Sequence, residues 1–154
     1  MDNKLFRQAM SKFATGINIV TIRHNNVIHG MTVNAFMSVS LDPKLIAISI
    51  DEKASMYQLI QDTKEFGISI LLEDQKDISM ILAKQKAADK EIEYKDVNNI
   101  PVLKDALVTM SCKVDEMVPA GDHMIFIAEV TSIEVKEGNP ILYYNGKYRK
   151  VDKE

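Results

Sequence analysis

The first third of the chain switches from a helical to an extended hydrophobic pattern. Apolar residues recur at helical spacing over residues 3–14, which predicts an amphipathic helix, and Gly16 follows where a helix stop is expected. Residues 17–22 are rich in β-branched side chains and predict a strand. The pair at 25–26 is Asn-Asn, which suits a two-residue hairpin turn because Asn tolerates positive φ. One long strand over residues 27–40 is expected to follow.

The middle of the chain alternates short apolar strands with short helices. Pro43 ends the long strand, because proline has no N–H to donate to the ladder. The elements predicted next are a strand over 45–50, a helix capped by Ser55 that runs to Ile60, a strand over 66–72 and a helix over 78–84. Residues 85–99 are highly charged with few large apolar side chains, which predicts a mobile loop outside the core.

The last third of the chain predicts two long strands and a closing hairpin. The long strands cover residues 107–118 and 124–135, and the hairpin pairs 141–144 with 147–151 about Asn145-Gly146. The whole pattern predicts a mainly β fold with about eight strands and a few short helices, and such a sheet is expected to close into a barrel. Helices alternate with strands too rarely for a doubly wound α/β fold.

Length and composition are those of one ordinary globular domain, taken as residues 1–154. The net charge of −3 and the lack of a Lys/Arg cluster argue against a nucleic-acid-binding protein. Cys112 is the only cysteine, which excludes an internal disulfide and a Cys-x-x-Cys site and favours a reducing, cytoplasmic location. The sequence has no signal-peptide pattern and no apolar run of transmembrane length, so no membrane contact is expected.

The segment from Gly30 to Leu41 carries the most informative pattern of polar residues, because alternate residues of a strand share a face. One face would hold Met31, Val33, Ala35, Met37, Val39 and Leu41, and the other Thr32, Asn34, Phe36, Ser38 and Ser40. The second face has hydroxyls and an amide but no charge. Unpaired buried polar groups cost about 1–3 kcal/mol each, so this face favours a polar, uncharged ligand such as a flavin ring. An exposed strand with short side chains explains the alternation equally well.

Two further segments suit ligand binding. Lys53 and Ser55 lie at the expected start of a helix, where free N–H groups and the helix dipole attract anions such as phosphate. An ordinary capped helix is the alternative there. His123 follows a Gly-Asp turn at the mouth of a strand, where its ring can reach into a site, with a surface turn as the alternative. His24 and His29 have no recognised metal-binding spacing with His123, so no metal site is expected.

Motifs of several other enzyme classes are absent from the sequence. There is no G-x-G-x-x-G after a strand, no P-loop and no G-x-S-x-G elbow. No paired-carboxylate arrangement stands out either. These absences argue against a Rossmann dinucleotide site, P-loop chemistry and a serine hydrolase.

Several short motifs occur in a definite order along the chain. They cover residues 6–10, 13–16, 29–35, 38–43, 74–75, 121–123 and 140–148. In that order they resemble the short-chain flavin reductase family, the reductase components of two-component flavin monooxygenases. Two positions depart from the family pattern: Lys44 stands where a second proline is common, and Ser69 stands where Asn is common. Ser69 is therefore left out of the predicted site.

The resemblance implies a split β-barrel of the Greek-key, FMN-binding type, and a homodimer with the flavin near the subunit interface. It implies reduction of FMN or FAD by NADH or NADPH, with reduced flavin supplied to a monooxygenase or another acceptor. The cofactor-binding residues that it implies are Thr32, Val33, Asn34, Ala35, Ser38, Val39 and Ser40, with Lys53 and Ser55 at the phosphate. His123 would be the catalytic residue, near the nicotinamide or the flavin edge.

The expected reaction moves hydride from nicotinamide to flavin, which needs no nucleophile or general base. Thr32 and Asn34 are expected to donate hydrogen bonds to the flavin. Three other interpretations stay open: a tightly flavin-bound electron carrier without its own NAD(P)H site, a related split-barrel flavin oxidase or binding module, and a β-barrel interaction domain without a cofactor. The choices between FMN and FAD, and between NADH and NADPH, are open as well.

Overall fold

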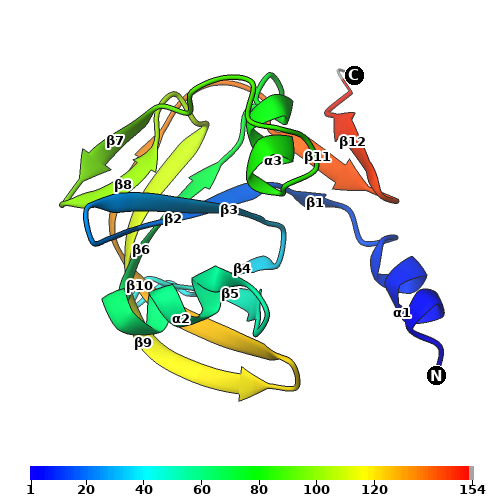
Figure 1. The fold of residues 1–154 in the computed structure, drawn as a ribbon, viewed down its shortest axis with the longest axis horizontal. Coiled ribbons are helices and arrows are strands. Elements are labelled where there is room, and N and C mark those ends of the chain that lie inside the picture. The colour runs from blue at the N-terminus through cyan, green and yellow to red at the C-terminus, as the bar shows by residue number, and fades with distance from the viewer. Residues whose placement is uncertain (153–154) are drawn as a thin grey trace.

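The chain folds into twelve strands and three helices over residues 1–152, which the computed structural model describes (Figure 1). Residues 153 and 154, the end of the predicted domain, lie outside the described residues. The predicted mainly β fold with a few short helices is confirmed, although there are more strands than expected. No helix among residues 1–152 is long and apolar enough to cross a membrane.

A seven-stranded antiparallel sheet forms the body of the molecule. Its strands, in spatial order, are β3 (Val27–Val33), β2 (Asn18–His24), β6 (Glu65–Ile70), β9 (Val108–Ala120), β10 (His123–Val135), β5 (Leu45–Asp51) and β4 (Phe36–Ser40). The two edge strands, β3 and β4, do not pair with each other, so the sheet is not closed by hydrogen bonds. The expected closure into a complete barrel is therefore wrong, and the barrel is split between β3 and β4.

The main hydrophobic core lies inside this sheet. Fully buried side chains from five of its strands meet there, among them Val20, Ile48, Phe66, Cys112 and Phe126. Helix α2 (Ser55–Thr63) adds Met56 and Ile60 to the same core. Burial of one apolar helix face against the sheet fixes α2, and with it the turn that precedes it.

A smaller sheet and a separate hairpin enclose a second core. β1 (Thr15–Gly16), β11 (Ile141–Tyr144) and β12 (Lys147–Lys150) form the sheet, and β7 (Tyr94–Val97) pairs with β8 (Ile100–Leu103) in the hairpin. Ile92 and Tyr94 pack against this second core. The prediction that residues 85–99 lie outside the core is therefore wrong for their second half. Charged residues are frequent there, but the segment forms the short strand β7 and packs against the second core.

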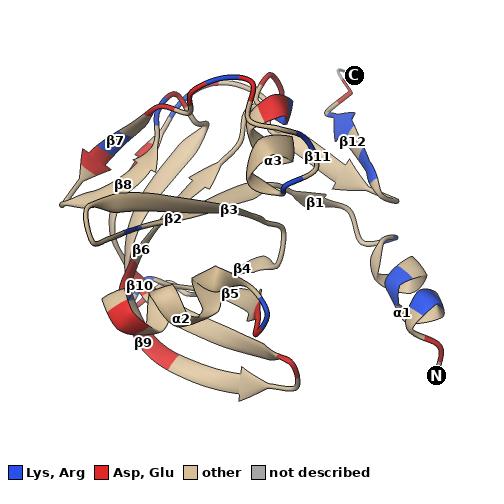
Figure 2. Cartoon of the chain, viewed as in Figure 1, with Lys and Arg blue, Asp and Glu red and all other residues tan. Residues whose placement is uncertain are grey.

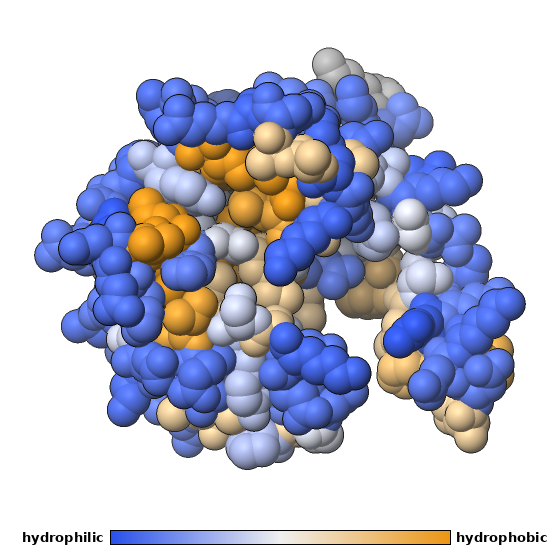
Figure 3. Space-filling view, in the orientation of Figure 1, coloured by the Kyte–Doolittle hydropathy of each residue, from blue (hydrophilic) through white to orange (hydrophobic). Residues whose placement is uncertain are grey.

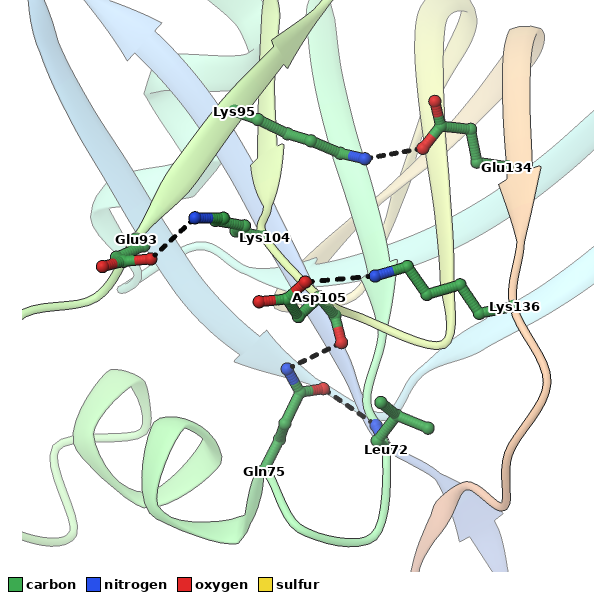
Figure 4. Close-up of polar contacts among 8 residues, drawn as sticks. All are labelled: Leu72, Gln75, Glu93, Lys95, Lys104, Asp105, Glu134 and Lys136. Carbon is green, nitrogen blue, oxygen red and sulfur yellow. Dashed lines mark hydrogen bonds and ion pairs between the residues drawn. The ribbon is translucent and has the colours of Figure 1, made fainter.

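Gln75 fixes the start of helix α3 (Lys76–Leu82) to the sheet. The Gln75 Oε1 atom accepts a hydrogen bond from Leu72 N at 2.9 Å, and the Nε2 atom donates one to the Asp105 carbonyl at 3.3 Å (Figure 4). Three exposed ion pairs lie above this contact in the same view: Lys136–Asp105, Lys104–Glu93 and Lys95–Glu134. Exposed ion pairs contribute little to stability, so the buried amide of Gln75 is the stronger anchor.

Helix α1 (Asn3–Met10) projects from the body of the molecule and buries none of its residues (Figures 1 and 3). It is shorter than the predicted 3–14, because the chain turns at Ser11, whose carbonyl accepts a hydrogen bond from Asn145 N at 2.9 Å. Basic residues gather on α1 and on β12 (Figure 2). The apolar residues of this amphipathic helix, Leu5, Phe6 and Met10, are more than half exposed.

The predicted long strand over residues 27–40 is broken at Asn34 and Ala35, between β3 and β4. Val33 before the break is buried, and Phe36 after it also packs against the core. In a continuous strand, residues three positions apart lie on opposite faces of the sheet. Because Val33 and Phe36 both face the core, the residues after the break lie on the face opposite to the one predicted for them. Met37, Val39 and Leu41, predicted to face the core, are instead 60%, 42% and 81% exposed.

The turns follow the sequence more closely than the strand ends do. Asn25 and Asn26 both adopt positive φ in the β2–β3 turn, as do Asn145 and Gly146 in the β11–β12 turn. Both predicted two-residue hairpins are confirmed, because these residue types tolerate the left-handed conformation that such turns require.

Candidate functional site

A groove runs along β3 and consists of three adjoining pockets. The cationic pocket, about 420 Å³, is lined by Gly30, Met31, Thr32, Lys53, Ala54, Ser55, Leu82, Ala83 and Lys84. The middle pocket, about 160 Å³, is lined by Ile17, Thr32, Asn34, Ser79, Ala83, Gln85, Tyr143 and Tyr148. The terminal pocket, about 210 Å³, is lined by Phe6, Arg7, Met10, Ser11, Phe13, Asn34 and Tyr143. In the space-filling view, apolar residues lie in the hollow between α3 and α2 (Figure 3).

The three pockets form one path because neighbours share walls. Thr32 and Ala83 line both the cationic and the middle pocket. Asn34 and Tyr143 line both the middle and the terminal pocket. A single elongated ligand can therefore lie along β3 with its two ends in chemically different surroundings.

The cationic pocket combines a helix start with two lysines. Helix α2 begins at Ser55, and the first N–H groups of a helix have no partner within it. Lys53 lies in the preceding turn, whose shape is set by a 2.9 Å hydrogen bond from Lys53 N to Asp51 Oδ1. Lys84 lines the pocket from the segment that follows α3, in the left-handed conformation with φ 59°. Such a set of donors and positive charges suits a phosphate group.

The predicted N-cap role of Ser55 is wrong by one position. Ala54 is the N-cap, and Ser55 is the first helical residue, with no side-chain cap hydrogen bond. The Ser55 hydroxyl is therefore not used to cap α2. It lines the cationic pocket and is free to contact a ligand there.

The middle pocket is uncharged, and its first hydroxyl already has an acceptor. Thr32 Oγ1 donates to the Ser79 carbonyl at 2.7 Å. A hydroxyl has one hydrogen, so Thr32 can offer a ligand only its lone pairs, and its predicted role as a donor to the flavin is revised. Asn34 is exposed at the junction with the terminal pocket. Its side-chain amide makes no hydrogen bond within residues 1–152, so its N–H groups and its oxygen are available to a ligand.

The structure brings together four of the nine predicted cofactor-binding residues. Thr32, Asn34, Lys53 and Ser55 line the groove. The side chain of Val33 is buried in the main core, and Ala35, Ser38, Val39 and Ser40 line none of the three pockets. The reason is the break at residues 34–35, which turns β4 out of line with β3. Flavin contacts at these five residues stay predictions.

His123 lies at the same end of the sheet as the cationic pocket but lines none of the three pockets. It is the first residue of β10 and is paired with Asp51 of β5, while Glu52 N donates to the Asp122 carbonyl at 2.9 Å. The turn that carries His123 is thus joined to the turn that carries Lys53. His123 is partly exposed, at 39% of its side chain.

The ring of His123 is oriented by its neighbour in sequence. Nδ1 lies 2.7 Å from Asp122 Oδ1. The hydrogen bond and charge of His123, with a smaller contribution from Lys53, lower the pKa of Asp122 below its usual value. Because Asp122 remains an acceptor, Nδ1 carries the proton and Nε2 is directed away from it.

Sequence reasoning missed the second wall of the groove. That wall is formed by Ser79, Ala83, Lys84, Gln85, Tyr143 and Tyr148, from α3, the segment after it and the β11–β12 hairpin. The two tyrosines stood among the family motifs, but no sequence signal placed them beside Thr32. Their approach to β3 depends on how distant segments pack.

Ser69 and Cys112 line none of the three pockets, and the described part of the chain contains no metal-binding cluster. Ser69, at the position that departs from the family pattern, is buried, and its hydroxyl accepts a hydrogen bond from Leu103 N at 2.9 Å. Cys112 is buried, and burial raises its pKa to about 12, so its thiol is not ionised near neutral pH. Among residues 1–152, no group of three or more His, Cys, Asp or Glu side chains could hold a metal ion.

The sequence over residues 10–152 matches the family model described as flavin reductase like domain. This chain belongs to the flavin reductase family. It is 37% identical over 149 residues to the NADH-dependent flavin reductase of Rhodococcus sp, covering 95% of this chain and 85% of that protein. It is 32% identical over 147 residues to the reductase component of 4-hydroxyphenylacetate 3-monooxygenase from Thermus thermophilus, covering 95% of each.

Solved structures of flavin reductases share the fold. Flavin reductase PheA2 in its native state is 48% identical and matches with a TM-score of 0.97, covering 99% of this chain and 100% of that one. The NADH:FAD oxidoreductase SgcE6 of Streptomyces globisporus C-1027, in complex with NAD and FAD fragments, is 26% identical with a TM-score of 0.92, covering 98% and 93%. The predicted family and split-barrel fold are confirmed.

The groove fits the flavin that this family uses. A flavin mononucleotide is elongated, with a phosphate at one end and uncharged carbonyl and hydroxyl groups along the rest. The phosphate would lie in the cationic pocket, held by Lys53, Lys84 and the N–H groups at the start of α2. The uncharged remainder would lie along Thr32 and Asn34.

A lysine substitution tests this placement. Lys53→Ala is expected to weaken FMN binding about tenfold, because one charge-assisted hydrogen bond to the phosphate is lost. Binding of riboflavin, which lacks the phosphate, should be unchanged. Both dissociation constants can be measured by quenching of flavin fluorescence.

Lys44→Ala is the matched control, because Lys44 is exposed and lines none of the three pockets. Equal weakening of FMN and riboflavin by Lys53→Ala would contradict the placement of the phosphate beside Lys53.

Proposed function

We propose that this chain is an NADH-dependent flavin reductase that supplies reduced flavin to a monooxygenase or another acceptor. The observation that carries the proposal is the groove along β3, in which a cationic pocket joins an uncharged one. Support also comes from relatives named NADH-dependent flavin reductase and reductase component of a monooxygenase. The rival interpretation, an electron carrier without a nicotinamide site, has no comparable support.

A flavin held in the groove would supply the electron-accepting chemistry, so the chain itself needs no nucleophile or general base. Its residues bind and orient. Lys53, Lys84 and the start of α2 hold the phosphate, and Thr32 and Asn34 align the uncharged part along β3. Alignment of two reactants in one site replaces much of the entropy that their encounter in solution would cost.

His123 is proposed to act on the nicotinamide side of the site. Asp122 fixes its Nδ1, which leaves Nε2 to accept a hydrogen bond from a carboxamide group. The hydrogen bond between the Lys53 turn and the Gly121-Asp122 turn fixes the backbone that carries the His123 ring. In this role His123 orients the donor and does not transfer a proton.

A homodimer is proposed from the exposed apolar surface. Leu5, Phe6, Met10 and Phe13, on and just after α1, are exposed, and so are Met37, Val39 and Leu41, on and just after β4. An eight-residue helix is not stable in water by itself and needs a packing partner. A second copy of the chain would cover both surfaces, because a two-fold interface uses each patch twice.

Several finer points stay predictions. They are the use of NADPH beside NADH, the preference between FMN and FAD, the identity of the acceptor, the single domain over residues 1–154 and the cytoplasmic location. The flavin contacts at Val33, Ala35, Ser38, Val39 and Ser40 belong with them. A subunit interface at β4 would place Ser38, Val39 and Ser40 beside a second copy of the chain.

The proposed activity can be tested directly. The purified chain with NADH and FMN is expected to oxidise NADH while the flavin loses its visible absorbance, followed in parallel at the two wavelengths. FAD, riboflavin and NADPH serve as comparison substrates. No nicotinamide oxidation with any of the three flavins would contradict the reductase function, and a yellow protein that NADH does not reduce would favour the electron carrier.

A further prediction concerns His123. His123→Ala is expected to lower kcat/KM for NADH about fivefold, the size of one lost neutral hydrogen bond, with an unchanged dissociation constant for FMN. Steady-state kinetics and fluorescence quenching measure the two quantities. His24→Ala is the control, since His24 at the end of β2 lines none of the three pockets. An unchanged kcat/KM would remove His123 from the site.

Another prediction concerns assembly. Light scattering after gel filtration is expected to give twice the chain mass of 17.4 kDa. Phe13→Asp should shift the protein toward the monomer, because a charge would be buried in the interface. Val27→Asp, which alters another exposed apolar residue, on the β2–β3 hairpin, should leave the mass unchanged. A wild-type monomer would refute the dimer.

A further inference from the structure

Tyr148 joins three segments of the chain at the wall of the middle pocket. Its hydroxyl lies 2.9 Å from Ser79 Oγ on α3 and 3.1 Å from Gln85 Oε1 in the segment after α3. Tyr148 itself belongs to β12. All three residues line the middle pocket, so this hydrogen-bond chain lies where the uncharged part of the flavin would pass.

The chemistry of the three groups determines which of them donates each hydrogen bond. The amide oxygen of Gln85 only accepts, so the Tyr148 hydroxyl donates to it. A phenol has one hydrogen, so the Ser79 hydroxyl must donate to the Tyr148 oxygen. With Oε1 held by Tyr148, the Nε2 group of Gln85 keeps both N–H donors, and neither is used in a hydrogen bond within residues 1–152.

The side chains that make these hydrogen bonds are held in place without a ligand. The Tyr148 ring meets Tyr143 edge to face at 5.4 Å, and Lys76 Nζ lies 5.4 Å from its centroid. Gln85 N donates to the Met80 carbonyl at 2.8 Å, which fixes the backbone of the segment. A donor held in place loses less entropy on binding than a free one.

We propose that Gln85 Nε2 binds an uncharged oxygen of the flavin and that Tyr148 is the positioning residue that orients it. The oxygen is a ring carbonyl or a ribityl hydroxyl, because Gln85 lies in the uncharged pocket and does not line the cationic one. This inference rests on the proposed flavin reductase function. It adds a binding residue from a segment that the sequence marked only as a charged loop.

The test compares flavin binding by four forms of the full chain without NADH: wild type, Gln85→Leu, Tyr148→Phe and the double variant. Gln85→Leu is expected to weaken riboflavin binding about fivefold, the value of one neutral hydrogen bond. Tyr148→Phe should weaken it about twofold to threefold, because the amide stays but is no longer oriented. The double variant should be no weaker than Gln85→Leu, since orientation has no effect without the amide.

A second flavin, a control variant and steady-state kinetics sharpen the result. Lumiflavin, which lacks the ribityl chain, assigns the contact: weakening with lumiflavin as well indicates a ring carbonyl, and weakening with riboflavin alone indicates a ribityl hydroxyl. Tyr144→Phe is the control, because Tyr144 neighbours Tyr143 on β11 but lines none of the three pockets. In steady-state assays KM for flavin should rise in the variants while kcat changes less than about twofold.

Unchanged binding of both flavins by Gln85→Leu would overturn the role of Gln85. Additive effects in the double variant would overturn the positioning role of Tyr148, and thermal unfolding of each variant shows that the comparison is made on folded protein. If the wild type oxidises NADH and the variants bind flavin as tightly as the wild type, only this inference is overturned. Wild-type inactivity would overturn the reductase function on which it rests.

Discussion

The break between β3 and β4 is the constraint on which the rest of the structure depends. These two strands are consecutive in the chain, yet they form the two opposite edges of the seven-stranded sheet. Only Asn34 and Ala35 connect them, and three extended chain steps from Val33 to Phe36 span roughly 10 Å at most. The edges must therefore approach each other at this end of the sheet although no ladder joins them.

That short connection has consequences on both sides of the sheet. It lets Val33 and Phe36 both face the core, which turns Met37 and Val39 outward and leaves an exposed apolar surface. It also leaves Asn34 out of either strand, at the junction of the middle and terminal pockets. One local irregularity thus separates a surface suited to assembly from a groove suited to a ligand.

Hydrophobic periodicity predicted the helices and most strands, and the Asn-rich turns predicted two hairpins, because these features depend on neighbouring residues. The break was not predicted, because apolar and polar residues alternate up to it and again after Met37, and Ala35 is small enough for either face; only the apolar run Ala35-Phe36-Met37 interrupts the alternation. The first wall of the groove could be predicted from Thr32, Asn34, Lys53 and Ser55. The second wall could not, because the contacts of Ser79 with Thr32 and Tyr148 cross 47 and 69 residues.

The middle and cationic pockets of the groove use different kinds of contact. In the middle pocket, Ser79 accepts from Thr32 through its carbonyl and meets Tyr148 through its hydroxyl, so α3 is held between β3 and β12. The width of this pocket is therefore set before a ligand binds. In the cationic pocket, Lys53 and Lys84 are exposed, and their long side chains can adjust to an anion. A fixed middle and an adaptable cationic end suit a ligand whose uncharged part must be aligned for electron transfer, while its phosphate serves only to hold it.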